Sequence, residues 1–180
     1  MTIQSRSEGH AEITGEILES HLGPGFTLPK YGGKSIVNIP DSICRWFDIP
    51  TFGIGPLQDA YISPISAPLK RVVLVIVDAV SYQHFQRWTQ ERKPAFWKPL
   101  LRAGHLSPIT SICPSTTCAA MSSIWTGQPA CRHGVSGYEM WMKEYNMAVN
   151  MIVHSPTTFH KGGGLLRQTG FDPETFLPLP

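Results

Sequence analysis

The feature that most constrains the fold is an uninterrupted apolar run, RVVLVIVDAV. Mostly β-branched residues fill Val72 to Val77, and Asp78 follows directly. Runs of this kind are typical of central strands in parallel sheets, which helices cover on both faces. An aspartate at the end of such a run is costly to bury unless it is paired, hydrogen-bonded or bound to a metal. The run therefore predicts a buried strand over 71–77 with Asp78 at its carboxyl end.

Strand and helix patterns alternate after this run. The expected elements are a strand over 71–77, helices over 81–91 and 95–103, a strand over 106–113, a helix over 118–125 and a strand over 148–154. This order predicts an α/β fold with a doubly wound, mostly parallel sheet.

The preceding part of the chain has a different organisation. The expected elements there are a helix over 11–21, a short strand over 35–39, a helix from Pro40 onward and a turn-rich connector over 50–68. We therefore divide the chain into two parts. Residues 1–69 form an N-terminal extension and connector that packs on the core, and residues 70–180 belong to the α/β domain.

Composition narrows the class of protein. The chain has 180 residues, of which 42% are hydrophobic and 16% are charged, so a globular domain is expected. A net charge of +2 predicts neither a nucleic-acid-binding surface nor a membrane surface. The polar N-terminus and the shortness of the longest apolar run indicate a cytoplasmic protein without a membrane span. Its four cysteines form no C-x-x-C pair and are expected to be free, buried thiols.

Three hydroxyl residues, Ser115, Thr116 and Thr117, stand between a proline and a run of small helix formers. They can be helix N-caps, or one of them can be a nucleophile. Asp78 likewise has two possible roles, as a cap for the helix near Ser81 or as a metal ligand. Because the carboxyl ends of parallel strands gather ligand groups, Asp78 and this hydroxyl group are expected to face one another. A helix N-terminus favours a bound phosphate, and a divalent cation lowers the pKa of a coordinated hydroxyl. Together these features favour a nucleophile and a metal ligand over two helix caps.

The segments VVLVIVDAV and PSTTCAAMSSIWTGQPACRHGVSGY resemble the type I phosphodiesterase and nucleotide pyrophosphatase family of the alkaline phosphatase superfamily. Members share a strand that ends in a metal-binding Asp, a P-[TS]-x-T nucleophile motif and a TG-x-x-P-x-x-HG-[IV]-x-G-like segment. The resemblance covers about residues 70 to 140. It implies that Asp78 is a metal ligand and that Thr117 is both the nucleophile and a metal ligand. The residues that match the wall beside the nucleophile helix are Thr126, Gly127, Pro129, His133 and Gly134, with His133 in a structural, hydrogen-bonding role.

The resemblance further implies a metal-dependent hydrolase of phosphodiesters or nucleotide pyrophosphate bonds that works through a phosphothreonine intermediate. Two divalent ions roughly 4 Å apart, zinc as the first choice and manganese as the second, would stabilise the attacking and leaving oxygens. The substrate would be a small phosphate ester. The sulfatase alternative needs a C/S-x-P-x-R motif, which the sequence lacks.

Two departures from the family pattern stand out. Many relatives carry an Asn three residues after the nucleophile, where this chain has Ala120. Downstream of Thr117 the D-x-x-x-H and D-H motifs that would complete two metal sites are also missing. The expectation is therefore an alkaline-phosphatase-like domain that is incomplete at its C-terminus, with little hydrolysis by the chain alone and a missing C-terminal part as its partner. The alternatives are a catalytically silent fragment that serves folding or partner binding, and a phosphomonoesterase or phosphomutase relative.

Overall fold

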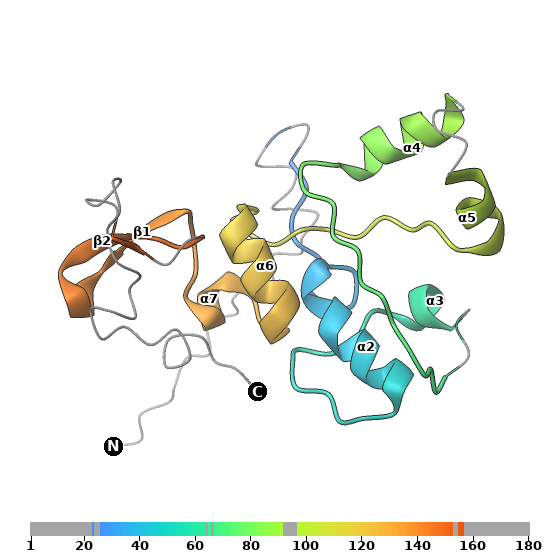
Figure 1. Cartoon of the computed structure of the whole chain (residues 1–180), viewed down its shortest axis with the longest axis horizontal. Helices are drawn as coiled ribbons and strands as arrows, with labels where there is room; N and C mark the ends of the chain where they lie inside the picture. Colours follow the sequence, from blue (N-terminus) through green and yellow to red (C-terminus); the bar gives the residue numbers. More distant parts are fainter. Residues whose placement is uncertain are drawn as a thin grey trace, which may run out of the picture.

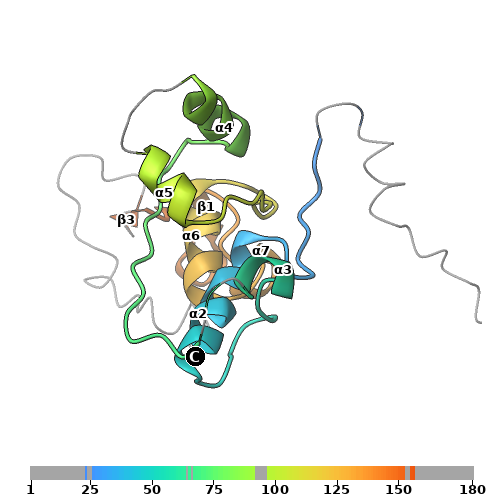
Figure 2. The same ribbon diagram turned by 90° about the vertical axis from the view of Figure 1, so that its right-hand side faces the viewer.

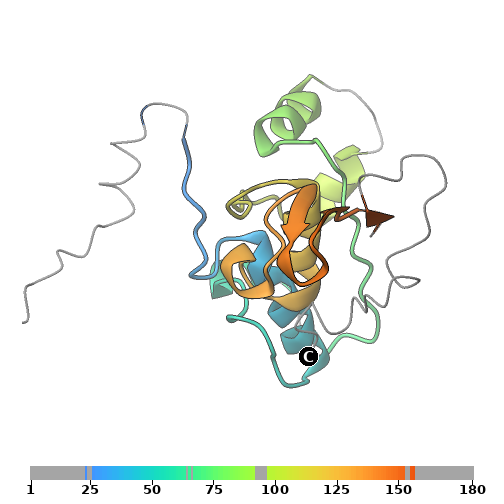
Figure 3. The ribbon, with the colours of Figure 1, turned by 90° about the vertical axis from the view of Figure 1, so that its left-hand side faces the viewer.

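The structure is a computed structural model, and it describes residues 23, 26–63, 65, 67–91, 97–152 and 155–156. Helix α6 (Thr117–Thr126) occupies the centre, between the β1–β2 hairpin on one side and α2 on the other (Figure 1). Seen from either side, α4 projects above this body (Figures 2 and 3). The elements in chain order are η1 (Ile36–Asn38), α2 (Ile39–Phe47), α3 (Asp59–Ile62), α4 (Tyr82–Gln90), α5 (Trp97–Ala103), α6, α7 (Ala130–His133), β1 (Glu139–Met142), η2 (Lys143–Tyr145), β2 (Met147–Asn150) and β3 (Ser155–Pro156).

Helix α6 links two hydrophobic clusters through adjacent residues. Cys118 packs in a cluster with residues of the hairpin region, namely Val135, Met142, Val149 and Met151. Ala119 packs in the other cluster, with Val37, Ile112 and Ala130. Small side chains allow both sides of α6 to be covered closely, so its N-terminal end is held by packing from two directions.

Helix α6 ends at Gly127, which adopts a left-handed φ of 62°. Glycine is the residue that takes this conformation at little cost at a helix end. The backbone of Gly53 lies against it, because a Cβ on Gly127 would come within 2.8 Å of the Gly53 Cα. The amide of Ile54 also donates to the Gly127 carbonyl at 3.0 Å. The loop after α2 therefore braces the C-terminal end of α6.

That loop is organised by Asp41, a fully buried carboxylate in the first turn of α2. Its Oδ1 accepts from the amides of Phe52 and Gly53 at 3.0 and 2.9 Å, and its Oδ2 accepts from the amide of Gly55 at 2.7 Å. Bonds of this charge-assisted kind are stronger than neutral ones, and the helix N-terminus favours a negative charge. Asp41 thus fixes the loop that contacts Gly127.

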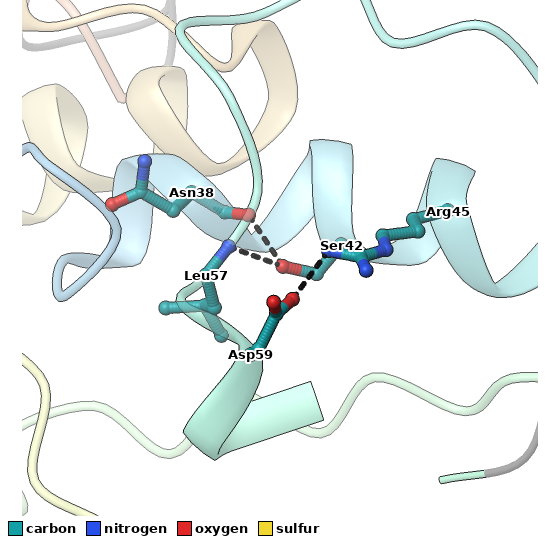
Figure 4. A network of polar contacts seen from close by, with 5 residues as sticks. All are labelled: Asn38, Ser42, Arg45, Leu57 and Asp59. Carbon is teal, nitrogen blue, oxygen red and sulfur yellow. Dashed lines mark hydrogen bonds and ion pairs between the residues drawn. The ribbon is translucent and has the colours of Figure 1, made fainter. Parts of the chain in front are cut away.

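A second group of polar contacts joins α2 to the chain entering α3 (Figure 4). The Ser42 hydroxyl donates to the Asn38 carbonyl at 2.8 Å and accepts from the Leu57 amide at 2.9 Å. Arg45 and Asp59 form an ion pair of 2.8 Å between exposed side chains. Exposed pairs of this type contribute little to stability, so the Ser42 contacts matter more for holding the connector.

Strands β1, β2 and β3 form a three-stranded antiparallel sheet in that order. In the β1–β2 pair, Glu139 lies opposite Asn150 and Met142 opposite Met147. The strand predicted over 148–154 is thus present in part as β2, but it belongs to an antiparallel hairpin. The short chain reversal at η2, with Asn146 in a left-handed conformation, dictates that direction.

The predicted strand over 71–77 is extended but has no ladder partner among the described residues. Figure 1 shows this stretch rising past α2 toward α4. Val73 and Val75 are 85% and 75% exposed, so the expected burial is not found among these residues. The segment predicted as a strand over 106–113 is not assigned as a strand either, and among the described residues an isolated parallel bridge joins Thr110 to Ser35. The doubly wound parallel sheet therefore stays a prediction.

The helices predicted over 81–91, 95–103 and 118–125 are confirmed as α4, α5 and α6, with residues 95–96 outside the described residues. The strand predicted over 35–39 is wrong, because residues from Ile36 onward form η1 and then α2. The Asn38 side chain accepts from the Ser35 amide at 3.1 Å and closes a turn, and Pro40 suits the first turn of a helix. The helix predicted over 11–21 lies outside the described residues.

The cysteine prediction is half right. All four cysteines are free, and Cys44 and Cys118 are buried. Burial raises the pKa of both of these thiols. Cys113 and Cys131 are exposed, contrary to expectation. No helix in the described part of the chain is long and apolar enough to cross a membrane.

Candidate active site

Thr117 is the first residue of α6, and the N-cap position belongs to Thr116. The Thr116 side chain makes no capping hydrogen bond, and its buried Oγ1 has no partner among the described residues. The capping explanation for this hydroxyl group is therefore not supported. The Thr117 hydroxyl is not a cap either, because its hydrogen bonds are with Asp78 and Tyr138.

Asp78 lies in a sharp turn at the end of the extended stretch. The next residue, Ala79, has a left-handed φ of 58°, which is unusual for a residue with a Cβ. The Asp78 Oδ1 accepts from the Ala79 amide at 2.9 Å. Helix α4 is capped by Ser81, whose Oγ accepts from the His84 amide at 3.2 Å. Asp78 is therefore not the cap of α4, and its Oδ2 remains directed at α6.

Three side chains from distant parts of the chain meet at Thr117. Its Oγ1 lies 3.4 Å from the Asp78 Oδ2, and the Tyr138 hydroxyl lies 2.9 Å from the same Oγ1. An ionised carboxylate only accepts, so Thr117 donates its single proton to Asp78 and accepts from Tyr138. The result is a directed chain of donors from the phenol through the threonine to the carboxylate.

The chain leading into α6 is held by the first residue of η1 and by residues before it. The amide of Ile36 donates to the Thr110 carbonyl at 2.9 Å, and the Thr110 amide donates to the Lys34 carbonyl at 2.8 Å. Nearer to Thr117, the amide of Cys113 donates to the Tyr31 hydroxyl at 3.2 Å. These contacts fix the approach of the segment that leads into α6, and they come from outside the region that carries the sequence motifs.

His133 is buried at the C-terminal end of α7, beneath α6. Its Nδ1 accepts from the Val135 amide at 3.1 Å, and its Nε2 lies 2.9 Å from the Ser123 Oγ. An accepting Nδ1 requires the proton on Nε2, which then donates to Ser123. Desolvation lowers the pKa of His133, against smaller opposing contributions from the backbone at His133 and Ala119. His133 is thus a neutral structural residue, as expected from the sequence.

Because the folded-state pKa of His133 lies below its unfolded value of about 6.5, the unfolded chain takes up this proton first. We expect the free energy of unfolding to fall as the pH is lowered below about 6.5, by at most about 1.4 kcal/mol per pH unit from this group. Urea unfolding at pH 7 and pH 5 measures the slope. His133→Gln should flatten it, while a matched change at the exposed His84, His84→Gln, should leave it unchanged. An unchanged slope in His133→Gln would contradict this assignment.

The sequence reasoning named Asp78 and Thr117, and the structure places them in contact. The sequence pattern did not indicate Tyr138, which lies 21 residues after Thr117 in the loop before β1. The available signal was a polar aromatic residue that follows directly on the HGVSG segment. Ala120 packs against the Val37 cluster, so its side chain faces the core rather than this site.

The fit to a metal ion is partial. Asp78 and Thr117 direct two oxygens to one place, which suits one side of an oxygen-coordinated divalent cation. Within the described ranges, no group of three His, Cys, Asp or Glu side chains is placed to hold a metal ion. The described residues therefore bring two oxygens together and do not complete a metal site.

A hydroxyl at the start of a helix, facing a carboxylate at the end of an apolar stretch, forms a candidate phosphoryl-transfer site. Residues 72–167 match the model of the type I phosphodiesterase/nucleotide pyrophosphatase family, and the chain belongs to that family. No curated protein and no solved structure is significantly similar to the chain. The family is one of phosphodiester hydrolases that are typically metal-dependent, and it implies an alkaline-phosphatase-like α/β fold.

Proposed function

We propose that the protein is a metal-dependent hydrolase of phosphodiesters or nucleotide pyrophosphate bonds in which Thr117 is the nucleophile. The observation that carries the proposal is the 3.4 Å contact between the Thr117 Oγ1 and the Asp78 Oδ2, across 39 residues of sequence. A nucleophile is recognised by a base within reach, oriented by a third group, and Asp78 and Tyr138 fill these places.

In the proposed first step, the Thr117 Oγ attacks phosphorus in line with the leaving oxygen. The bond from Oγ to phosphorus forms, the bond from phosphorus to the leaving oxygen breaks, and the threonine proton passes to Asp78. The leaving group departs as its anion, which is p-nitrophenolate for the test substrate, and Thr117 keeps the rest of the ester as a phosphoryl adduct. The positive end of α6 favours the charged phosphoryl oxygens.

A divalent ion held by Asp78 and Thr117, zinc as the first choice and manganese as the second, would stabilise the charge on the reacting oxygens. We propose two such ions, as the family resemblance implies. Because the described residues supply only two converging oxygens, repeated turnover is not required of the chain in the test of this proposal. The test measures the first step alone.

The test is rapid mixing of the full chain with bis(p-nitrophenyl) phosphate, with and without zinc. The proposal predicts a metal-dependent burst of p-nitrophenolate that approaches one equivalent per chain. Mono-p-nitrophenyl phosphate in the same assay separates a diesterase from a monoesterase. Absence of a burst with zinc and with manganese would support a silent protein that serves folding or partner binding instead.

Asp78→Asn is expected to reduce bound zinc by at least half, because the amide lacks the charge that holds a cation. Secondary structure should not change, since Asn keeps the oxygen that accepts from the Ala79 amide. Elemental analysis after equilibrium dialysis against zinc gives the answer. Asp59→Asn, at an exposed carboxylate paired with Arg45, is the matched control and should bind as much zinc as the wild type. Equal metal content in all three proteins would contradict the assignment of Asp78 as a metal ligand.

A further inference from the structure

Tyr138 contacts the reacting atom of the proposed nucleophile. Its hydroxyl is 2.9 Å from the Thr117 Oγ1, and the direction of the hydrogen bonds makes the phenol the donor. The side chain is 44% exposed, whereas Thr117 is half-buried. The Tyr138 hydroxyl therefore lies beside Thr117 on a residue that solvent reaches.

The role of this donor changes when the Thr117 oxygen bonds to phosphorus. Before attack, the phenol holds Oγ in the orientation that aims its proton at Asp78. After attack, Oγ is a bridging ester oxygen and a weak acceptor, while the non-bridging phosphoryl oxygens beside it carry the charge. In phosphoryl transfer the transition-state charge is spread over those oxygens, so a donor poised next to them stabilises the transition state.

We propose, on the basis of the function proposed above, that Tyr138 is a catalytic residue. Its phenol orients the Thr117 oxygen and then donates to a non-bridging oxygen of the transferring phosphoryl group. Among the described residues, it is the side-chain donor that the structure places on Thr117. Ala120 packs in the core and provides no side-chain donor there.

The measurement is the rate of the p-nitrophenolate burst from bis(p-nitrophenyl) phosphate with zinc, in the full chain. Tyr138→Phe removes the donor and keeps the ring, and it should slow the burst by about 100-fold, the size seen when one transition-state donor is removed. The amplitude should stay at one equivalent, because Thr117 is intact. Tyr61→Phe is the matched control: its hydroxyl donates to the Pro108 carbonyl at 3.3 Å, so the burst rate should match that of the wild type.

Orthovanadate, which mimics the five-coordinate phosphoryl group, provides a second measurement that does not need chemistry. Its dissociation constant with zinc, measured by equilibrium dialysis, should rise at least ten-fold in Tyr138→Phe and not in Tyr61→Phe. A thermal melt of each variant accompanies both measurements. A burst rate and a vanadate affinity within two-fold of wild type in a folded Tyr138→Phe would overturn the role of Tyr138 and leave the proposed function standing. A wild-type chain with no burst would overturn the proposed function and this role with it.

Discussion

Replacing Asp41 by alanine is expected to lower the free energy of unfolding by about 3–5 kcal/mol, the largest stability effect we expect from one substitution in this chain. The carboxylate is fully buried and accepts from three backbone amides of the loop after α2. Its removal leaves those amides without their acceptor and frees the loop that contacts Gly127. The midpoint of thermal unfolding should fall by about 10 °C, judged from domains of similar size.

Two further variants make the Asp41 prediction specific. Asp41→Asn should have an intermediate effect, because one amide oxygen can still accept while its NH2 group faces the Gly55 amide, a donor. Asp59→Ala removes an exposed carboxylate from a surface ion pair and should change the stability by no more than about 1 kcal/mol. Equal losses in Asp41→Ala and Asp59→Ala would show that burial and the three amide bonds do not set the effect.

The elements that could be predicted are those that local sequence determines. The helices predicted over 81–91 and 118–125 lie at Tyr82–Gln90 and Thr117–Thr126, within one residue of the predicted bounds. Strand pairing was harder, because it depends on partners that are distant in sequence. The apolar run over 71–77 was predicted to be a buried strand, but it pairs with no strand among the described residues and its valines are exposed, and local pattern cannot say which strand would lie beside it. At 35–39 the β-branched pair Ile36–Val37 suggested a strand, but the Asn38 turn and Pro40 direct the chain into a helix.

The same distinction between local sequence and distant partners applies to the residues of the site. The contact between Asp78 and Thr117 could be anticipated, because one follows an apolar run and the other begins a helix after an extended segment. Tyr138 and Asp41 could not, since their partners are set by tertiary packing. Tyr138 reaches Thr117 only because the loop before β1 returns to the start of α6. Asp41 looks like an ordinary first-turn carboxylate until the loop at 52–55 folds over it.

Thr117→Ala is expected to reduce the burst of p-nitrophenolate by at least about 1,000-fold, because the attacking oxygen is removed. The stability should change by no more than about 1 kcal/mol, since the Thr117 side chain is not a cap. Two control variants bracket this result. Thr117→Ser keeps a hydroxyl and should retain the burst within about ten-fold. Thr116→Ala removes the neighbouring hydroxyl, which has no partner among the described residues, and should leave the burst unchanged.

The most direct measurement is the mass of the peptide that carries Thr117 after the full chain is mixed with bis(p-nitrophenyl) phosphate and zinc and quenched in acid. The attack described above transfers one p-nitrophenyl phosphoryl group to the Thr117 oxygen. We therefore predict a single adduct of that mass, which fragmentation places on Thr117, and no adduct on the same peptide of Thr117→Ala. An adduct on Ser115 or Thr116, or a burst of p-nitrophenolate that persists in Thr117→Ala, would contradict the assignment of Thr117 as the nucleophile.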